Sequence, residues 1–452
     1  MTTQLPPPLD TRFTPMYGVY EKLAAEAAAA QNTVCVQIAC VRDGGDCDTF
    51  KMELAAPLSD TAIRFCERVV KFMMWASGGK QIHIRAPETL TRRIAADYST
   101  QGARAFDCAL MEDAYDTAPT VITEGAMPRP QAHTISLGGY LNGCRLGFDL
   151  GASDFKISAV KDGETVFADE IPWVPVTATD PDYHFNMLRD GLKKAAAHLP
   201  RVDAIGGSSA GIIVENKIKV ASLIRGIAKA DRPKSLNLFR RIQKEWDDIP
   251  LEVANDGDVT ALAGALSLKT NAILGIAMGS SQAGGYIDRN GRLTGRLNEL
   301  AFTPVDYNPD AAQDEWSKDY GVGASYFSQQ AVNRLALEAG FEFPDDMPLP
   351  ERLKTVQTAM TTDDPRAEKI YTTIGVYLGW TIPWYRLFYD IDTILLLGRV
   401  TSGKGGEIIV SKATETLLAI APQIADTIRL MMPDEQSRRV GQCVAAASLP
   451  KF

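Results

Sequence analysis

Short apolar runs alternate with amphipathic stretches along this chain, and two of the runs repeat each other. Residues 146–163 (LGFDLGASDFKISAVKDG) align without a gap on residues 274–291 (LGIAMGSSQAGGYIDRNG). Each copy predicts a strand, a Gly/Ser turn, a second strand and a polar turn that ends in glycine. Glycine and serine at such a turn let backbone N–H groups approach a phosphate closely. The repeat therefore predicts two hairpins whose turns face each other across a cleft and bind a polyphosphate from both sides.

The patterns around these hairpins predict a mixed α/β chain. Helical periodicity is expected at 21–31, 61–77, 184–198, around 235–246 and through much of 321–389, and strands at 34–41, 80–87 and 202–214. Residues 251–267 predict a strand that runs into an Ala-rich helix, and 392–410 a buried strand, a glycine-rich turn and a helix. Strands that alternate with crossover helices are typical of an α/β architecture.

Composition excludes several classes of function. The net charge of −9 over 452 residues argues against a broad nucleic-acid surface, so nucleic acid is not an expected partner. The seven cysteines have no Cys-x-x-Cys spacing, which favours reduced thiols over a disulfide framework or a zinc knuckle. No apolar run is long enough to span a membrane, and the first residues lack the features of a signal peptide. We therefore expect a cytoplasmic protein without a membrane partner.

The first candidate residue is Asp149, which ends an apolar strand directly before the turn 151–153. A carboxylate at this place can hold Mg²⁺ through water while the turn amides meet phosphate oxygens. The alternative is a strand that simply ends in an Asx-type turn, and the existence of the second copy weighs against it. The second copy has Ala277 at the matching position, so its turn can bind anions only through amides and hydroxyls.

Asn255 and Asp256 stand where the strand at 251–254 gives way to a helix. Such residues commonly cap helices, and as an isolated dipeptide they favour that interpretation. The functional alternative makes Asp256 a general base, which accepts the proton of a substrate hydroxyl during transfer of a γ-phosphoryl group. The position of this dipeptide between the two repeats favours the functional alternative.

Three further positions carry weaker signals. The turn Gly279-Ser280-Ser281 is either a plain β-turn or a phosphate cradle, and Glu299 is either a solvated charge or a ligand of sugar hydroxyls. Gly398 ends a buried strand, where a small residue lets a flat base approach the backbone or simply opens a helix. Neither a dinucleotide-binding GxGxxG in a suitable context nor a GxxxxGK[ST] P-loop is present.

Five segments taken together, 146–160, 202–211, 253–265, 275–302 and 393–400, resemble the ROK family of sugar kinases. That family belongs to the actin-like ATPase superfamily together with the hexokinases. The resemblance covers roughly residues 145–430. It implies an α/β fold of two ribonuclease-H-like lobes around a central cleft. We therefore expect an N-terminal α/β extension (1–143), a first lobe (144–257) and a second lobe (258–452) whose C-terminal helix can return to the first.

The resemblance also implies roles for individual residues. Asp256 is the catalytic base, and the substrate-binding residues are Ser209, Asn255 and Glu299. The nucleotide-binding residues are Asp149, Gly151, Ala152, Ser153, Gly279, Ser280, Ser281 and Gly398. The cofactors are ATP and Mg²⁺, the metal being held by Asp149 through water. The sequence leaves the oligomeric state open, and a homodimer is one candidate because related kinases are commonly dimers.

The chain departs from the family at three points. Asp154 stands where the first phosphate loop usually has a cation, which should weaken nucleotide binding by like-charge repulsion. Phe302 replaces a histidine that contacts the sugar, and the zinc-binding cysteine cluster is missing, so no structural zinc is expected. Residues 1–143 also do not show the winged helix of the family's repressors.

These features favour a carbohydrate kinase that phosphorylates a hydroxyl of a sugar or sugar-like polyol. The alternative is a non-catalytic, sugar-sensing regulator on the same fold, which Asp154, Phe302 and the N-terminal extension would suit. A chaperone-type ATPase with a protein partner is a third possibility, and Asn255, Asp256 and Glu299 at sugar-facing positions argue against it.

Overall fold

A computed structural model describes residues 6–131, 138–151, 154–433 and 435–452 of the chain. The chain divides into two compact units, and each unit is made of three separate segments of the sequence. Unit 1 comprises residues 1–133, 276–284 and 296–432, and unit 2 comprises 134–275, 285–295 and 433–452. These units are defined by contacts along the whole chain, whereas the predicted extension and lobes are continuous ranges taken from the family resemblance. Residues 1–133 share a unit with most of the expected second lobe.

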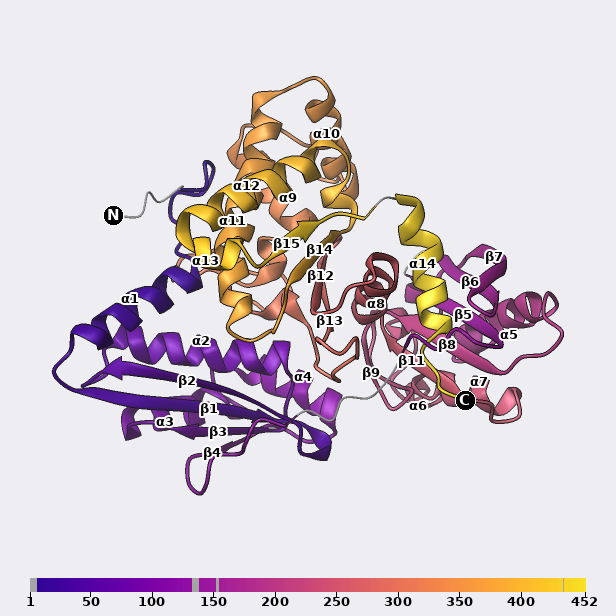
Figure 1. Ribbon diagram of the computed structural model, residues 1–452, viewed down its shortest axis with the longest axis horizontal. Coiled ribbons are helices and arrows are strands. Elements are labelled where there is room, and N and C mark those ends of the chain that lie inside the picture. Colours follow the sequence, from indigo (N-terminus) through magenta and orange to yellow (C-terminus); the bar gives the residue numbers. More distant parts are fainter. Residues whose placement is uncertain (1–5, 132–137, 152–153, 434) are drawn as a thin grey trace. The chain divides into compact units, whose positions relative to one another are not determined.

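The N-terminal part of unit 1 is a four-stranded sheet with helices. Its elements are α1 (Met16–Ala29), β1 (Thr33–Val41), β2 (Cys47–Ala55), α2 (Asp60–Ala76), β3 (Gln81–Arg85), α3 (Glu88–Asp97), α4 (Ala105–Tyr115) and β4 (Thr120–Ile122). The strand order is β2-β1-β3-β4, and α2 runs along one face of this sheet (Figure 1). Ser59 caps α2 by accepting a hydrogen bond from the N–H of Ala62 at 3.2 Å.

The later part of unit 1 is mainly helical. It contains α9 (Gln329–Glu338), α10 (Leu349–Thr361), α11 (Pro365–Arg386), β14 (Thr393–Leu397), α12 (Lys404–Ile420), α13 (Pro422–Ala425) and β15 (Arg429–Met431). Strands β14 and β15 join the second predicted hairpin, β12 (Ile273–Met278) and β13 (Gln282–Ile287), in a sheet of order β13-β12-β14-β15. The turn of this hairpin lies in unit 1, and the other ends of its strands lie in unit 2.

Unit 2 is built on a five-stranded sheet of order β11-β8-β5-β6-β7. Its elements are β5 (Cys144–Leu150), β6 (Asp154–Lys161), β7 (Glu164–Pro172), α5 (Tyr183–Ala196), β8 (Ala204–Ser209), β9 (Ile212–Val214), β10 (Lys217–Val220), α6 (Arg232–Leu236), α7 (Leu238–Glu245), β11 (Leu251–Asn255), α8 (Asp256–Leu268) and α14 (Glu435–Ala447). Strands β5 and β6 form the first predicted hairpin, with Asp149 opposite Lys156. Strands β5, β8 and β11 run parallel.

Helices cover both faces of this sheet. On one face, α5 and α7 bury a core in which Phe148 of β5 stacks on Phe239 of α7, with ring centroids 5.8 Å apart. On the other face, α14 lies against β5, β8 and α8 (Figure 1). A Cβ atom on Gly206 of β8 would come within 1.7 Å of the carbonyl oxygen of Ala446, so α14 approaches the sheet backbone directly. The mixed α/β class predicted from the sequence is confirmed.

The described residues also bear on two of the compositional expectations. All seven cysteines have free thiols, and all but Cys35 are buried. Among the helices in the described part of the chain, none is both long and apolar enough to cross a membrane.

Candidate active site

Three parallel strands of unit 2 end at one edge of the sheet and bring candidate residues together. Asp149 of β5 pairs in register with Ser208 of β8, and Ser209 of β8 pairs with Asn255 of β11. Asp256 follows as the first residue of α8. In open α/β sheets, ligands commonly bind in the crevice outside the carboxyl ends of parallel strands. The fold therefore places Asp149 and Asp256 at a site suited to chemistry.

Asp149 is buried and surrounded by polar groups from distant parts of the sequence. Its Oδ1 atom accepts hydrogen bonds from Ser208 Oγ at 2.7 Å and from Gln442 Nε2 of α14 at 3.3 Å. Lys156 Nζ lies 3.6 Å from its Oδ2 atom. Burial raises the pKa of Asp149 by more than the bond from Ser208 and the charge of Lys156 lower it. The carboxylate is thus held in one orientation but is short of positive charge.

Asn255 and Asp256, the two residues where β11 gives way to α8, differ in what their side chains contact. Asn255 is the cap of α8: its Oδ1 accepts from the N–H of Gly257 at 2.8 Å and its Nδ2 donates to the carbonyl of Gly211 at 2.9 Å. Asp256 Oδ1 accepts from the same N–H at 2.9 Å. Burial first, and the charge of Asp149 second, raise the pKa of Asp256 to about 6. A carboxyl group with that pKa suits a general base near neutral pH.

Asp154, which follows the first turn, lies close to a cation. Asp154 was expected to repel phosphate, but its Oδ1 atom lies 3.5 Å from Lys156 Nζ, so its charge is partly compensated. Lys156 also faces Asp149 across the hairpin. A cation therefore lies beside Asp149 and Asp154, two residues later in the sequence than the family pattern places it. Gly151 donates its N–H to the carbonyl of Asp154 at 3.1 Å, while the candidates Ala152 and Ser153 lie outside the described residues.

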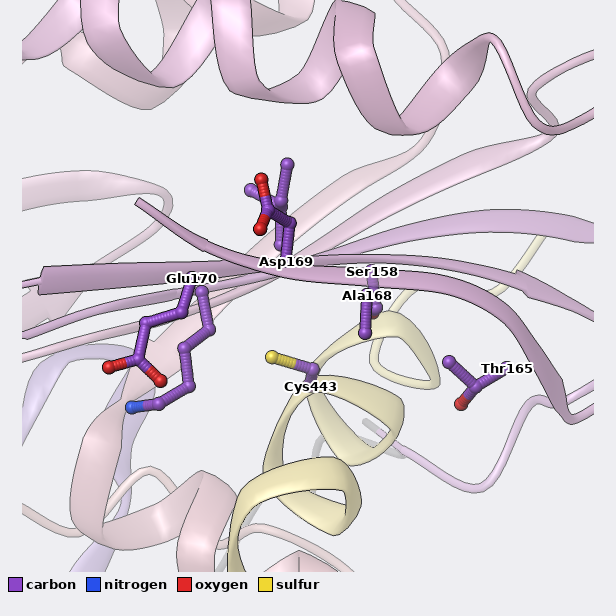
Figure 2. A pocket seen from close by; sticks show the side chains of 8 residues that line it. Ser158, Thr165, Ala168, Asp169, Glu170 and Cys443 are labelled. Carbon is purple, nitrogen blue, oxygen red and sulfur yellow. The ribbon is translucent and has the colours of Figure 1, made fainter. Parts of the chain in front are cut away.

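A small pocket lies beside Lys156, between the outer strands and α14. Figure 2 shows Cys443 of α14 on one side and Ser158 and Glu170 of β6 and β7 on the other. The cavity measures about 210 Å³, below the roughly 300–1,000 Å³ of typical ligand pockets. Ser158 Oγ is buried there without a hydrogen-bond partner among the described residues. A cavity of this size is too small for a nucleotide.

The second turn and Gly398 lie together in unit 1. The N–H of Gly279 donates to the carbonyl of Ser281 at 2.9 Å, and Ser280 and Ser281 are exposed. Gly398 has φ of +94°, and a Cβ atom there would come within 2.4 Å of the carbonyl oxygen of Met278. Only glycine fits this conformation and this approach. The strand end at Gly398 is thereby seated against the strand that leads into the second turn.

Glu299 and Phe302, the residue that stands in place of the family's histidine, also belong to unit 1. Phe302 is buried, and its ring centroid lies 4.4 Å from that of Trp75. It therefore serves as a core residue that packs on α2 and is not a direct substitute for a sugar-contacting histidine. Glu299 is partly buried, and its backbone N–H donates to the carbonyl of Trp75 at 3.0 Å.

Several residues of this site escaped the sequence interpretation. Ser208 and not Ser209 bonds to Asp149, and Ser209 is fully buried with its hydroxyl 3.4 Å from the carbonyl of Ala210. Gln442 comes from α14, far along the chain, and no motif announces it. Lys156 could have been found, since a lysine two residues into the second strand of a tight hairpin faces the last residues of the first.

The carboxylate of Asp149, at the carboxyl end of β5, is the kind of ligand that Mg²⁺ uses. Within the described ranges, no group of three or more His, Cys, Asp or Glu side chains could hold a metal ion. Mg²⁺ usually takes one or two carboxylates and completes its coordination with water and phosphate oxygens. Asp149 beside the first turn offers such a carboxylate. Its role toward the metal and the roles of the other candidates stay predictions.

Comparison with known proteins bears on the fold. No protein-family model and no curated protein sequence matches the chain. Among solved structures, the ROK hexokinase from Thermus thermophilus matches with a TM-score of 0.52 and 18% identity, over 67% of this chain and 97% of that one. A ROK family glucokinase from Streptomyces griseus, in complex with glucose and AMPPNP, matches with a TM-score of 0.51 and 17% identity, over 68% and 98%.

A regulator shares the same likeness. The ROK family transcriptional regulator described as a homolog of the E. coli MLC protein matches with a TM-score of 0.52 and 19% identity, over 68% of this chain and 78% of that one. Kinases and a regulator of one family thus match about equally well. The resemblance predicted from the sequence motifs is confirmed as a likeness of fold: over about two-thirds of its length, the chain has the fold of the ROK family.

Proposed function

We propose that the protein is an ATP- and Mg²⁺-dependent kinase that phosphorylates a hydroxyl of a sugar or sugar-like polyol in the cytoplasm. The observation that carries the proposal is Asp256: a partly buried carboxyl group at the carboxyl edge of parallel strands, beside Asp149, with a pKa of about 6. The likeness to ROK family sugar kinases supports the same chemistry.

In this proposal Asp256 accepts the proton of the attacking hydroxyl as that oxygen bonds to the γ-phosphorus. Asn255 fixes the start of α8 and so holds Asp256 in place, because both polar atoms of its side chain are engaged by backbone groups. Glu299 would add a sugar contact, whereas Ser209, the other residue that the resemblance assigns to the sugar, is fully buried and directs its hydroxyl to the carbonyl of Ala210. The hydroxyl must replace water as the acceptor, so the site must exclude water when the sugar is bound.

The nucleotide would be held by its phosphates. The turn after Asp149, with Lys156 beside it, and the turn Gly279–Ser281 would supply amides, hydroxyls and a cation, and Gly398 would leave room for the base. A bound Mg²⁺, held through Asp149, would neutralise phosphate charge. A homodimer remains part of the proposal, on the basis of the family resemblance.

The test is ATP consumption with a panel of sugars and polyols, comparing the natural protein with Asp256→Asn. Loss of the base should lower kcat by on the order of 10³-fold, while calorimetric binding of AMPPNP stays within about twofold. Asp258→Asn is the matched control, since it lies on the same helical turn and its amide oxygen can still accept from the N–H of Tyr286, now 3.1 Å from Asp258 Oδ1. Retention of most of the activity in Asp256→Asn would refute the base role.

A non-catalytic sugar-sensing regulator is the second candidate. It is favoured by the likeness to a transcriptional regulator and by the use of Phe302 in the core instead of at the sugar. For this candidate we expect calorimetric binding of a sugar with no ATP consumption by the natural protein. Sugar-dependent ATP consumption that is lost in Asp256→Asn would exclude it.

A further inference from the structure

The last turn of α2, in the N-terminal part of the chain, is joined to the segment that carries Glu299. The N–H groups of Leu297, Asn298 and Glu299 donate to the carbonyls of Ser77, Ala76 and Trp75 at 3.3, 3.0 and 3.0 Å. The final carbonyls of a helix have no partners within it, so they are available to an incoming strand-like segment. The three hydrogen bonds run in sequence along both segments, which fixes the register of one against the other.

The side chain of Asn298 adds a fourth tie at this joint. Asn298 has φ of +53°, a conformation that asparagine tolerates better than most residues, and it is buried. The hydroxyl of Tyr389 donates to Asn298 Oδ1 at 3.0 Å and lies 3.5 Å from the carbonyl oxygen of Ala76. Tyr389 thus contacts both the helix end and the segment.

The residue just before this segment is tied to the N-terminal sheet as well. Arg296 forms an ion pair with Asp48 of β2 and donates to the carbonyl of Phe388 at 2.8 Å. Asp48 also pairs with Arg42 at 2.5 Å, and Arg42 donates to the carbonyl of Ser77 at 3.0 Å. The N-terminal region therefore holds the segment from two sides, through β2 and through α2.

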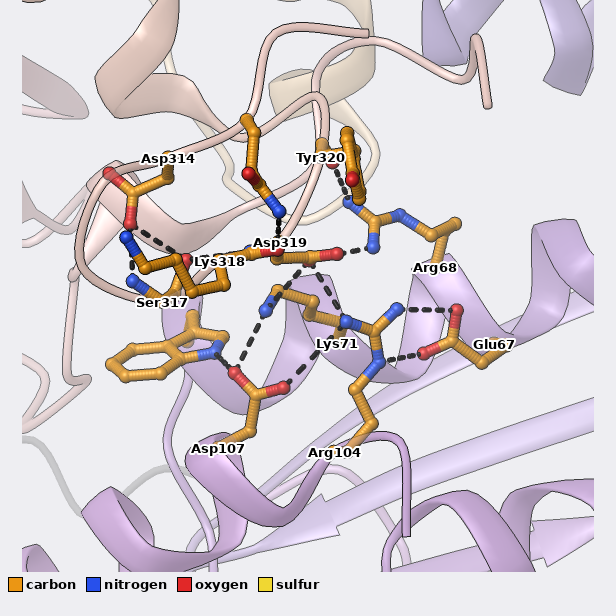
Figure 3. Close-up of polar contacts among 12 residues, drawn as sticks. Glu67, Arg68, Lys71, Arg104, Asp107, Asp314, Ser317, Lys318, Asp319 and Tyr320 are labelled. Carbon is orange, nitrogen blue, oxygen red and sulfur yellow. Dashed lines mark hydrogen bonds and ion pairs between the residues drawn. The ribbon is translucent and has the colours of Figure 1, made fainter. Parts of the chain in front are cut away.

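The helix end that makes these contacts is itself held firmly. Figure 3 shows Lys71 and Arg104 lying among three carboxylates, Glu67, Asp107 and Asp319. Lys71 Nζ lies 2.8 Å from Asp107 Oδ1 and 2.9 Å from Asp319 Oδ2. The indole N–H of Trp75 donates to Asp107 Oδ1 at 2.7 Å. Because buried ion pairs have strict geometry, this cluster fixes α2 in both position and rotation.

We propose that the N-terminal region is the positioning element of the sugar-binding segment, acting through the last turn of α2. It holds the backbone of residues 297–299 and so sets where the carboxylate of Glu299 stands. Trp75 and Phe302 pack together at the same joint, so the position at which the family resemblance places a sugar contact serves here to dock α2. The proposal rests on the proposed function for the role of Glu299, and it gives residues 1–133 a task within the substrate site.

The first test compares Tyr389→Phe and Trp75→Phe with Tyr371→Phe. Phenylalanine at 389 keeps the ring under the Arg296 guanidinium, 4.9 Å from the ring centroid, and removes only the hydroxyl tie. Phenylalanine at 75 removes the indole N–H that anchors the helix end. Tyr371 is the matched control, because it is fully buried in the same unit and its hydroxyl has no hydrogen-bond partner among the described residues.

We expect both joint variants to raise the KM for the sugar about tenfold, with the KM for ATP and the kcat within about twofold of the natural values. Tyr371→Phe should leave all three unchanged. A general loss of structure would lower kcat and both affinities together, so this division of effects separates positioning from instability. Unchanged sugar KM in both joint variants would overturn the proposal.

The second test does not depend on catalysis. Amide hydrogen exchange of peptides that cover residues 296–302 should be faster in Tyr389→Phe than in the natural protein and in Tyr371→Phe. Unchanged exchange would overturn the claim that the joint holds this segment. A natural protein that phosphorylates nothing and yet shows faster exchange in Tyr389→Phe would refute the kinase proposal while supporting the joint.

Discussion

Two groups of charges, one partly buried in unit 2 and one buried in unit 1, differ in their balance of positive and negative charge. The acidic cluster of unit 2 has three carboxylates, Asp149, Asp154 and Asp256, and one cation, Lys156. The balanced cluster of unit 1 has three carboxylates and three cations, namely Glu67, Asp107 and Asp319 with Arg68, Lys71 and Arg104. The acidic cluster therefore has more negative than positive groups, whereas the balanced cluster has equal numbers of both.

The pKa values of the two clusters follow this difference. Burial would raise the pKa of Asp319, but Arg68, Lys71 and Arg104 together lower it well below its ordinary value. At Asp149 and Asp256 burial prevails, and both pKa values are raised. Structural clusters are neutralised within the fold, whereas a site that binds a cation or moves a proton keeps carboxylates short of partners. The raised pKa values therefore identify the acidic cluster, and not the balanced cluster, as the one to test as an active site.

The largest expected effect comes from breaking the balanced cluster. Lys71→Met leaves Asp107 and Asp319 with less compensation in a buried site, which should lower the free energy of unfolding by about 3–5 kcal/mol. Urea denaturation at neutral pH measures it. Lys193→Met is the control, because its pair with Glu245 is exposed, and it should change stability by less than about 0.5 kcal/mol. A loss below about 1 kcal/mol in Lys71→Met would show that the cluster is not structural.

The second-largest effect is a gain in stability, expected when the carboxylate of Asp256 is removed. Because the pKa of Asp256 rises from 3.8 to about 6 on folding, its ionisation destabilises the folded protein as pH rises through that window. Asp256→Asn should therefore be more stable than the natural protein by roughly 1–3 kcal/mol above pH 6, and equally stable below about pH 4. Denaturation curves at several pH values measure the difference. A variant that is less stable at high pH would contradict the raised pKa.

The smallest effect concerns the single cation of the acidic cluster. Lys156→Met should weaken binding of AMPPNP with Mg²⁺ about tenfold and leave sugar binding unchanged, because the lost charge stands beside the first turn. Titration calorimetry at low and high salt measures it, and the difference should shrink at high salt. Lys161→Met on the exposed far end of the same strand serves as control. Equal affinities in both variants would remove Lys156 from the nucleotide site.

Many of the helices and strands could be predicted, because local patterns of apolar and polar residues determine them. The repeated hairpins, the strand that leads into α8 and the helix α2 all have strong periodicity or turn signals, and each forms close to where it is expected. Strand β2 is not among the predicted strands, although Phe50, Met52 and Leu54 alternate with exposed residues in the pattern of a half-buried strand. The assignment of residues 1–133 to a unit with later helices depends on contacts between segments far apart in sequence, which periodicity does not encode.

The candidate site was predictable in part for a similar reason. Asp149, Asp256 and the second turn stand out because each ends an element, and their roles stay predictions until they are tested. The partners that set their chemistry could not be found in this way: Ser208 and Gln442 reach Asp149 only through strand register and the packing of α14. The contact of Phe302 with Trp75 could not be predicted either, because it depends on an N-terminal region that the family pattern does not include.

The close approach of α14 to Gly206 has a consequence for how the protein is made. The strands β5, β8 and β11 leave the ribosome well before α14, because the whole later part of unit 1 is synthesised in between. Until then the sheet lacks the helix that packs on Gly206. Packing of α14 on this sheet can therefore occur only after the later part of unit 1 has been synthesised.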